Sequence, residues 1–81
     1  MDDLYSKTLK LVAEHFGLGK VHEEDDLIHD LNGDALDVIE LVMELEEVFN
    51  IVISDDEAER VRFVKDICDI VFKKVNQNVP V

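Results

Sequence analysis

Carboxylates dominate the side chains of this chain that could do chemistry. Four of them recur at spacings of three or four residues and form what we call the acidic stripe: Asp37, Glu40, Glu44 and Glu47. On an α-helix, like charges at these spacings repel by roughly 0.2–0.5 kcal/mol per pair, so the stripe lowers the stability of the isolated helix. Because these charges lower the stability of the helix, we expect them to serve a function. The function that fits them is attraction of a positively charged partner.

The acidic stripe has apolar neighbours. On a helical wheel, Leu36 and Met43 fall at the edge of the stripe rather than on the face that turns inward. Methionine suits surfaces that meet several different partners, because its side chain is flexible and polarizable. Asp34 is a favourable N-cap, since its carboxylate can accept a hydrogen bond from a free amide of the first turn. We therefore expect residues 34–47 to dock onto basic partners.

Nucleophilic and metal-ligating residue types are few. Cys68 falls on the apolar face of a predicted helix, so we expect a buried hydrophobic side chain rather than a nucleophile. His15 ends another predicted helix, and His22 and His29 lie in a predicted loop. No spacing among these four residues is typical of a catalytic or metal site. We therefore expect no catalytic residue.

A calcium loop is the one metal motif that the carboxylates faintly resemble, at residues 30–34. An EF-hand loop that began at Asp30 would need Gly at its sixth position and Glu at its twelfth. The chain has Ala35 and Leu41 there, so the motif fails. We expect diffuse attraction of divalent cations and no dedicated metal site.

Net charge limits the partners of this chain. Its 81 residues include 8 Lys and Arg against 20 Asp and Glu, which gives a formal charge of -12. Residues 21–59 hold fifteen of the acids and no Lys or Arg, whereas an ordinary solvated surface mixes both signs. This charge repels nucleic-acid phosphates and anionic lipids, so we expect neither nucleic-acid binding nor membrane insertion.

Chain length and cysteine count limit the class of protein. The 81 residues predict one small domain, 1–81, with little room for both a core and an enclosed catalytic cavity. We therefore expect a non-catalytic protein. A single Cys makes no intrachain disulfide, and we see no leader segment and no apolar run near ~20 residues. We expect a soluble, cytoplasmic monomer.

Apolar residues recur with a helical period in four segments, which predicts an all-α, four-helix bundle with a long first loop and a short third helix. The predicted helices cover about residues 2–16, 35–49, 55–61 and 63–75. Gly17 ends the first helix, and Ser54 with Glu57 forms a capping box that starts the third. We expect the tail, residues 76–81, to be frayed.

The predicted core comes mainly from the second and fourth helices. The inward face of the second helix holds six apolar residues: Leu41, Val48, Leu45, Val38, Phe49 and Val42. The inward face of the fourth holds five: Val64, Ile67, Cys68, Val71 and Val75. Residues 49–53 end in three β-branched residues but have no partner strand, so we expect a loop that packs inward.

Likeness to a known family is concentrated in two segments. Asp30–Phe49 (DLNGDALDVIELVMELEEVF) and Ile53–Glu59 (ISDDEAE) closely resemble the acyl carrier protein family. The resemblance implies a four-helix carrier whose Asp-Ser-Leu motif bears 4′-phosphopantetheine on its serine. Acyl groups would travel on it as thioesters among basic patches of fatty-acid-synthesis enzymes. A phosphopantetheinyl transferase would attach the group.

At the position of the attachment serine this chain has Ala35. A methyl group has no oxygen to attack the coenzyme A pyrophosphate, so we expect 4′-phosphopantetheine to be absent and the chain to stay in its apo form. Ser6 and Ser54 belong to other predicted helices and do not replace the serine. The flanking residues match the family pattern, which favours an engineered Ser-to-Ala change over a natural loss of the group: Asp34, Leu36, Asp37, Glu40, Met43, Glu44 and Glu47.

Two other functions stay open on the sequence. One is an acidic adaptor or regulatory homologue that never carried a cofactor. The other is a carrier whose cargo is a polyketide intermediate or D-alanine. The run ELVMELE at residues 40–46 favours fatty acids among the possible cargoes.

Overall fold

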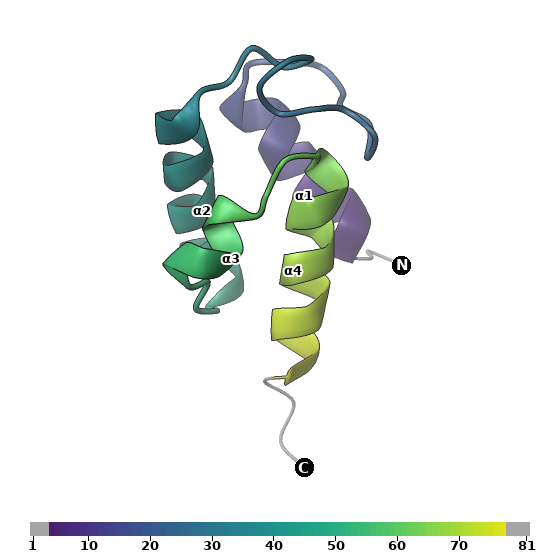
Figure 1. Cartoon of the computed structure of the whole chain (residues 1–81). Coiled ribbons are helices and arrows are strands. Elements are labelled where there is room, and N and C mark those ends of the chain that lie inside the picture. The colour runs from purple at the N-terminus through teal and green to yellow at the C-terminus, as the bar shows by residue number, and fades with distance from the viewer. Residues whose placement is uncertain (1–3, 78–81) are drawn as a thin grey trace.

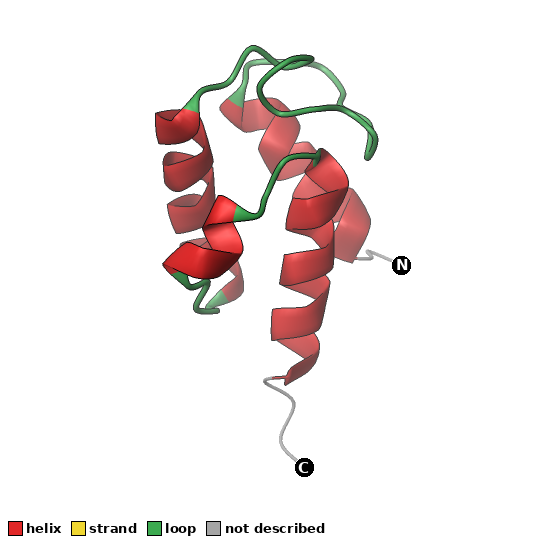
Figure 2. Ribbon diagram, in the orientation of Figure 1, coloured by secondary structure: helices red, strands yellow, loops and turns green. Residues whose placement is uncertain are grey.

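Four α-helices make up the regular structure in residues 4–77, the part of the chain that the computed structural model describes (Figure 1). They are α1 (Leu4–His15), α2 (Ala35–Phe49), α3 (Asp55–Glu59) and α4 (Val64–Gln77). α1 runs opposite to α2 and α4, and the short α3 lies against α2 (Figure 1). The long loop after α1 crosses one end of the bundle (Figure 2). The expected all-α class, with its long first loop and short third helix, is confirmed.

The ends of α1 and α3 differ slightly from the expected ones. α1 ends at His15 rather than at residue 16, and Gly17 follows with a φ of 68°, a left-handed conformation that favours glycine. α3 ends at Glu59 rather than at residue 61, where the amide of Arg60 donates to the carbonyl of Glu57. Differences of one or two residues are ordinary at the ends of helices, where the last turn frays.

α4 is longer than expected. The predicted helix stops at residue 75, but the helix continues to Gln77, so the tail does not begin at residue 76. The side-chain amide of Asn76 donates to the carbonyl of Phe72 at 2.8 Å, a bond that supports the last turn. Residues 2 and 3 of the predicted first helix and residues 78–81 of the predicted tail lie outside the described part of the chain.

α3 is held at both sides. The predicted capping box is confirmed, because the Ser54 hydroxyl accepts from the Glu57 amide and the Glu57 carboxylate accepts from the Ser54 amide. The Lys74 ammonium of α4 lies 2.9 Å from the same carboxylate. The Ser54 amide and Lys74 lower the pKa of Glu57 to about 2. This carboxylate therefore joins α3 to α4.

The core is a cluster of buried apolar side chains from α1, α2, α4 and the loops. The predicted inward face of α4 is buried from Val64 to Val71, and Cys68 is a buried free cysteine in it, as expected. Ile51 and Ile53 pack inward from a loop, as expected, but Val52 between them is 78% exposed. None of the helices in the described residues is long and apolar enough to cross a bilayer.

One predicted core residue of α2 is wrong. Leu41, Val42 and Leu45 are buried, but Val48 is 47% exposed. A helical wheel gives the direction of a side chain and not the depth of its surroundings. Two turns beyond Leu41, the neighbouring elements no longer cover the direction in which Val48 points.

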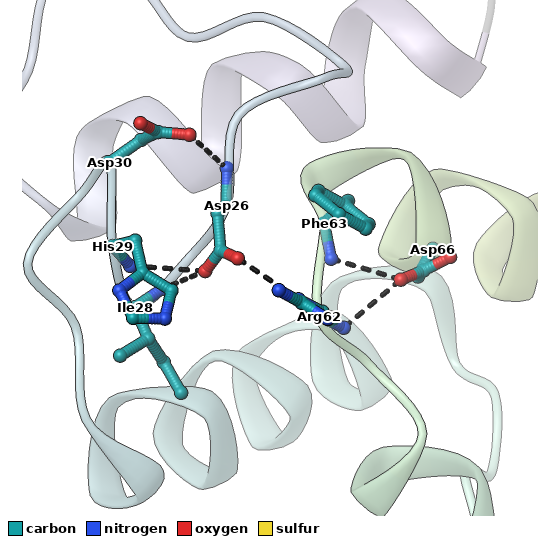
Figure 3. Close-up of polar contacts among 7 residues, drawn as sticks. All are labelled: Asp26, Ile28, His29, Asp30, Arg62, Phe63 and Asp66. Atoms are coloured by element: carbon teal, nitrogen blue, oxygen red, sulfur yellow. Dashed lines mark hydrogen bonds and ion pairs between the residues drawn. The ribbon is translucent and has the colours of Figure 1, made fainter.

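The buried carboxylate of Asp26 ties the long loop to the start of α4 (Figure 3). Its Oδ1 accepts from the amides of Ile28 and His29 at 2.9 and 3.0 Å, and its Oδ2 accepts from Nε of Arg62 at 3.1 Å. The His29 amide leads these bonds in lowering the pKa of Asp26 to about 2. Asp26 is therefore ionised throughout the physiological range and holds two segments together.

Backbone hydrogen bonds complete the same junction. The first amides of α4 have no partner within the helix, and Val64 and Lys65 donate theirs to the loop carbonyls of Asp25 and Glu23, both at 2.9 Å. In return, the Leu27 amide donates to the Arg62 carbonyl at 2.9 Å. The loop thus serves as the N-terminal cap of α4.

Gly33 connects the ordered loop to the start of α2. Its amide donates to the carbonyl of the fully buried Leu27 at 2.9 Å, one residue before the N-cap of α2. A Cβ at this position would lie 2.7 Å from the Leu27 carbonyl oxygen and 2.9 Å from the Phe16 ring. Only glycine lets the loop approach the core this closely, so Gly33 fixes where α2 begins.

We expect Asp26→Asn to lower the melting temperature at neutral pH and to flatten its loss in acid. Because the pKa is about 2 in the fold and 3.8 ordinarily, ionised Asp26 stabilises the fold above about pH 4, and this contribution is lost as the pH falls toward 2. Thermal unfolding measured from pH 7 down to about 2 tests this. Glu24→Gln, an exposed acid of the same loop, is the control. Equal acid profiles for wild type and Asp26→Asn would contradict the assignment.

Gly33→Ala should lower the free energy of unfolding by about 1–3 kcal/mol, because the added methyl overpacks the loop against the Leu27 carbonyl. Gly19→Ala is the matched control, since a Cβ there meets nothing within 4 Å. Urea denaturation of both variants measures the difference. A Gly33→Ala variant as stable as Gly19→Ala would show that the close approach does not position α2.

Candidate functional site

The N-terminus of α2 is built by a reciprocal cap. Oδ1 of Asp34 accepts from the Asp37 amide and Oδ2 of Asp37 accepts from the Asp34 amide, both at 3.0 Å. Asp34 is therefore the N-cap, as predicted, and the box that Asp37 completes goes beyond the prediction. Ala35 follows as the first residue of the helix, and it is exposed. Its side chain is a methyl group that offers neither a nucleophile nor a ligand atom.

The acidic stripe runs down the exposed side of α2 from this cap. Glu40, Glu44 and Glu47 are exposed, and Asp37 is half-buried. Within residues 4–77, no lysine or arginine forms a salt bridge with any of the four. The structure thus brings the predicted residues together on one surface, where no lysine or arginine of the described residues neutralises their charge.

Histidine is the neighbour of the stripe that sequence reasoning missed. His15, at the end of α1, places Nδ1 2.6 Å from Oε2 of Glu44 and Nε2 3.4 Å from Oδ1 of Asp37. Its side chain is only 11% exposed, and its ring packs edge-on against Phe16. The residues are far apart in sequence, and only the antiparallel packing of α1 on α2 joins them (Figure 1). The helical period of α1 gives no sign of this contact.

An apolar ridge accompanies the stripe. Leu36, Ile39 and Met43 are 60%, 52% and 61% exposed, and their spacings of three and four residues place them along one line of α2. Leu36 and Met43 are among the predicted residues, whereas Ile39 was missed. Its spacing between the other two is the signal that would have found it. The candidate site is therefore a mixed acidic and apolar face of one helix.

Groups that could do chemistry elsewhere are held inactive by their surroundings. Burial raises the pKa of the Cys68 thiol to about 12, so the reactive thiolate is not formed at neutral pH. The hydroxyl of Tyr5 donates to the Asp69 carboxylate, and this bond raises the pKa of Tyr5 to about 12. Neither residue contributes to the face of α2.

Comparison with known proteins agrees with this architecture. Residues 6–71 match the family model described as a phosphopantetheine attachment site. The acyl carrier protein of Buchnera aphidicola subsp. Baizongia pistaciae is 44% identical over 77 residues, which cover 93% of this chain and 99% of that protein. The acyl carrier protein of Syntrophobacter fumaroxidans is 44% identical over 69 residues, which cover 83% of this chain and 85% of that protein.

A solved structure shows the same arrangement of helices. The crystal structure of the acyl carrier protein from Thermotoga maritima matches this chain with a TM-score of 0.77 and 39% sequence identity. The match covers 91% of this chain and 88% of that one. A family model that spans most of the chain, close relatives of the same length and a shared fold all lead to one conclusion. The chain belongs to the acyl carrier protein family.

Proposed function

We propose that this chain is the apo scaffold of an acyl carrier for fatty-acid synthesis, with residue 35 at the attachment position. The observation that carries the proposal is the place of Ala35, exposed at the first residue of α2 directly after the Asp34 cap. A group attached there would leave the protein beside the acidic stripe. Docking through α2 would therefore aim that group at the site on which the partner acts.

The residues present do not fit covalent attachment of 4′-phosphopantetheine. The family uses a serine oxygen to form the bond to phosphorus, and the methyl group of Ala35 has no lone pair to do so. Ser54 does not replace it, because its hydroxyl caps α3 by accepting from the Glu57 amide. Ser6 lies on α1, on a different helix from residue 35. We infer that the chain as written stays in its apo form.

The face of α2 supports a transient docking role. Its acidic stripe attracts basic patches over several ångströms and speeds the encounter at low salt. The apolar ridge adds a small area of short-range contact, which allows a complex to form and to separate again. We infer that the partners are basic patches of fatty-acid-synthesis enzymes and of a phosphopantetheinyl transferase.

We assign this work to the cytoplasm and to a carrier rather than an enzyme. The one cysteine is a free thiol buried in the core, as suits a reducing compartment. The face of α2 presents carboxylates and apolar side chains but no pair of nucleophile and base. Binding and presentation are therefore the actions that its chemistry supports.

We expect Ala35→Ser to restore attachment. Incubated with coenzyme A and a phosphopantetheinyl transferase, the variant should gain the mass of one phosphopantetheine, whereas the Ala35 chain should gain none. Intact-mass spectrometry measures both. Ala35→Ser combined with Ser54→Ala should react equally well, which would place the modification at residue 35. A folded Ala35→Ser variant that gains no mass would support the cofactor-less adaptor instead.

Glu47→Lys should weaken docking without unfolding the chain. Glu47 is exposed and unpaired, so reversing its charge removes attraction to a basic patch and costs no internal contact. We expect roughly tenfold weaker binding to the transferase at low salt, with the difference shrinking as salt screens the charges. Titration calorimetry with the Ala35 chain measures binding without turnover.

Glu59→Lys is the matched control for Glu47→Lys, since it makes the same charge change on α3. Affinity that falls equally for both variants would mean that net charge, and not the face of α2, governs docking. Unchanged affinity for Glu47→Lys at low salt would show that the acidic stripe does not contribute to docking.

A further inference from the structure

A largely buried histidine of α1 lies against the acidic stripe of α2. His15 ends α1, and only 11% of its side chain is exposed. Its Nδ1 lies 2.6 Å from Oε2 of Glu44, and its Nε2 lies 3.4 Å from Oδ1 of Asp37. Both ring nitrogens therefore face carboxylates of the docking surface, and both carboxylates come from a helix other than that of the histidine.

Carboxylates are the titratable groups that face this imidazole. Besides Asp37 and Glu44, one oxygen of Glu40 lies within 4.8 Å of a ring nitrogen. On α1 itself, the preceding Glu14 is exposed. Within residues 4–77, no other carboxylate lies within 4.0 Å of the ring nitrogens, and no lysine or arginine forms a salt bridge with the three acids of α2. A proton on His15 therefore places a positive charge among acids of the stripe.

A neutral imidazole cannot satisfy both of its contacts. It carries one N–H, so it donates to one carboxylate and turns the lone pair of its other nitrogen toward the second. The 2.6 Å contact indicates that Nδ1 carries the proton and donates to Glu44. Nε2 and Oδ1 of Asp37 then oppose each other at 3.4 Å. A proton on Nε2 turns this opposition into a second hydrogen bond between opposite charges.

The carboxylates that hold this imidazole also serve docking. A proton on His15 changes the net charge of the stripe and its histidine from -4 to -3. The protonated ring holds Asp37 and Glu44 together, so a basic partner must compete with it for both. Asp37 is also the residue that accepts from the Asp34 amide at 3.0 Å, next to residue 35. The competition therefore takes place beside the attachment position.

We propose that the protonation of His15 regulates docking through α2. The neutral imidazole leaves the charge of the acidic stripe to a basic partner, and the protonated imidazole neutralises part of it. Histidine is the side chain whose charge ordinarily changes between about pH 5 and 8. Affinity for a basic partner therefore falls as the pH falls through the titration of His15. Because coupling between two binding equilibria is reciprocal, docking in turn releases the proton.

This regulation rests on the docking role of α2 proposed above, and it does not depend on an attached group. Calorimetric titration of the Ala35 chain with a phosphopantetheinyl transferase, at low salt and from about pH 8 to 5.5, tests it. We expect binding to weaken by about threefold across the titration of His15. Glu47→Lys, which changes two charges of the stripe instead of one, is expected to cost about tenfold.

Two further measurements use the unchanged chain. NMR of the ¹⁵N-labelled histidine side chains gives the pH at which His15 titrates, and the affinity should change around the same pH. At that pH, calorimetry in two buffers of different ionisation enthalpy measures the protons that docking releases. We expect a release that is absent from the same titration of His15→Gln.

Three variants separate protonation from packing. His15→Gln keeps a neutral hydrogen-bond donor at this place, so it should bind at every pH as the unchanged chain binds at high pH. His15→Arg carries a permanent charge and should bind weakly at every pH. His22→Gln removes an exposed imidazole of the loop and should keep the pH dependence of the unchanged chain. All three meet the same transferase, so the partner's own titration is common to them. Circular dichroism checks that each variant folds.

The proposal is overturned if His15→Gln and His22→Gln have the same pH profile. It is also overturned if the affinity of the unchanged chain does not follow the titration of His15, a comparison that needs no variant to fold. Failure of the docking role itself gives a different result, because Glu47→Lys would then bind the transferase as the unchanged chain does.

Discussion

The buried carboxylate of Asp26 is the interaction on which the position of α2 depends. The loop between α1 and α2 has little regular structure, and ordering such a segment costs conformational entropy. Asp26 offsets this cost by accepting from loop amides and from Arg62, which ties the loop to the start of α4 (Figure 3). The Leu27 carbonyl then accepts a hydrogen bond from the Gly33 amide, and the next residue, Asp34, caps α2. The place of residue 35 is therefore set from within the core.

The acids of this chain divide into two physical classes. Asp26 and Glu57 accept hydrogen bonds and face a basic side chain, and both have a lowered pKa, so their charge stabilises the fold. Glu46 accepts from the Ile53 amide and orders the loop after α2. The charges of the acidic stripe repel one another, and only Asp37, which caps α2, and Glu44, which contacts His15, have a polar partner among the described residues. The charge of the stripe therefore remains available to a basic partner.

Local signals in the sequence predicted α2 best. Asp34 can cap a helix by itself, so the start at Ala35 follows from one residue, and the apolar period carries the helix to Phe49. The Ser54 capping box is equally local. The end of α4 was missed because the helix continues beyond its last apolar residue, where the Asn76 side chain supports the final turn by donating to the Phe72 carbonyl.

Features that depend on tertiary contact could not be read from spacing. Asp26 is one of four consecutive acids, and nothing in that run indicates which one is buried against Arg62. His15 was read as a residue at a helix end, although it meets Asp37 and Glu44 once α1 packs on α2. Val48 points in the same direction as Leu41, but Leu41 is buried by its neighbours whereas Val48 is exposed. In each case the missing information is how the neighbouring elements pack.

We propose that docking and attachment share one face of α2, which begins at residue 35. Amide chemical-shift mapping tests it most directly, with the ¹⁵N-labelled Ala35 chain titrated by a phosphopantetheinyl transferase that cannot modify it. We expect the largest shifts to fall within residues 34–47 and to shrink as salt is added. Shifts centred on α3 or α4, with residues 34–47 unchanged, would contradict it.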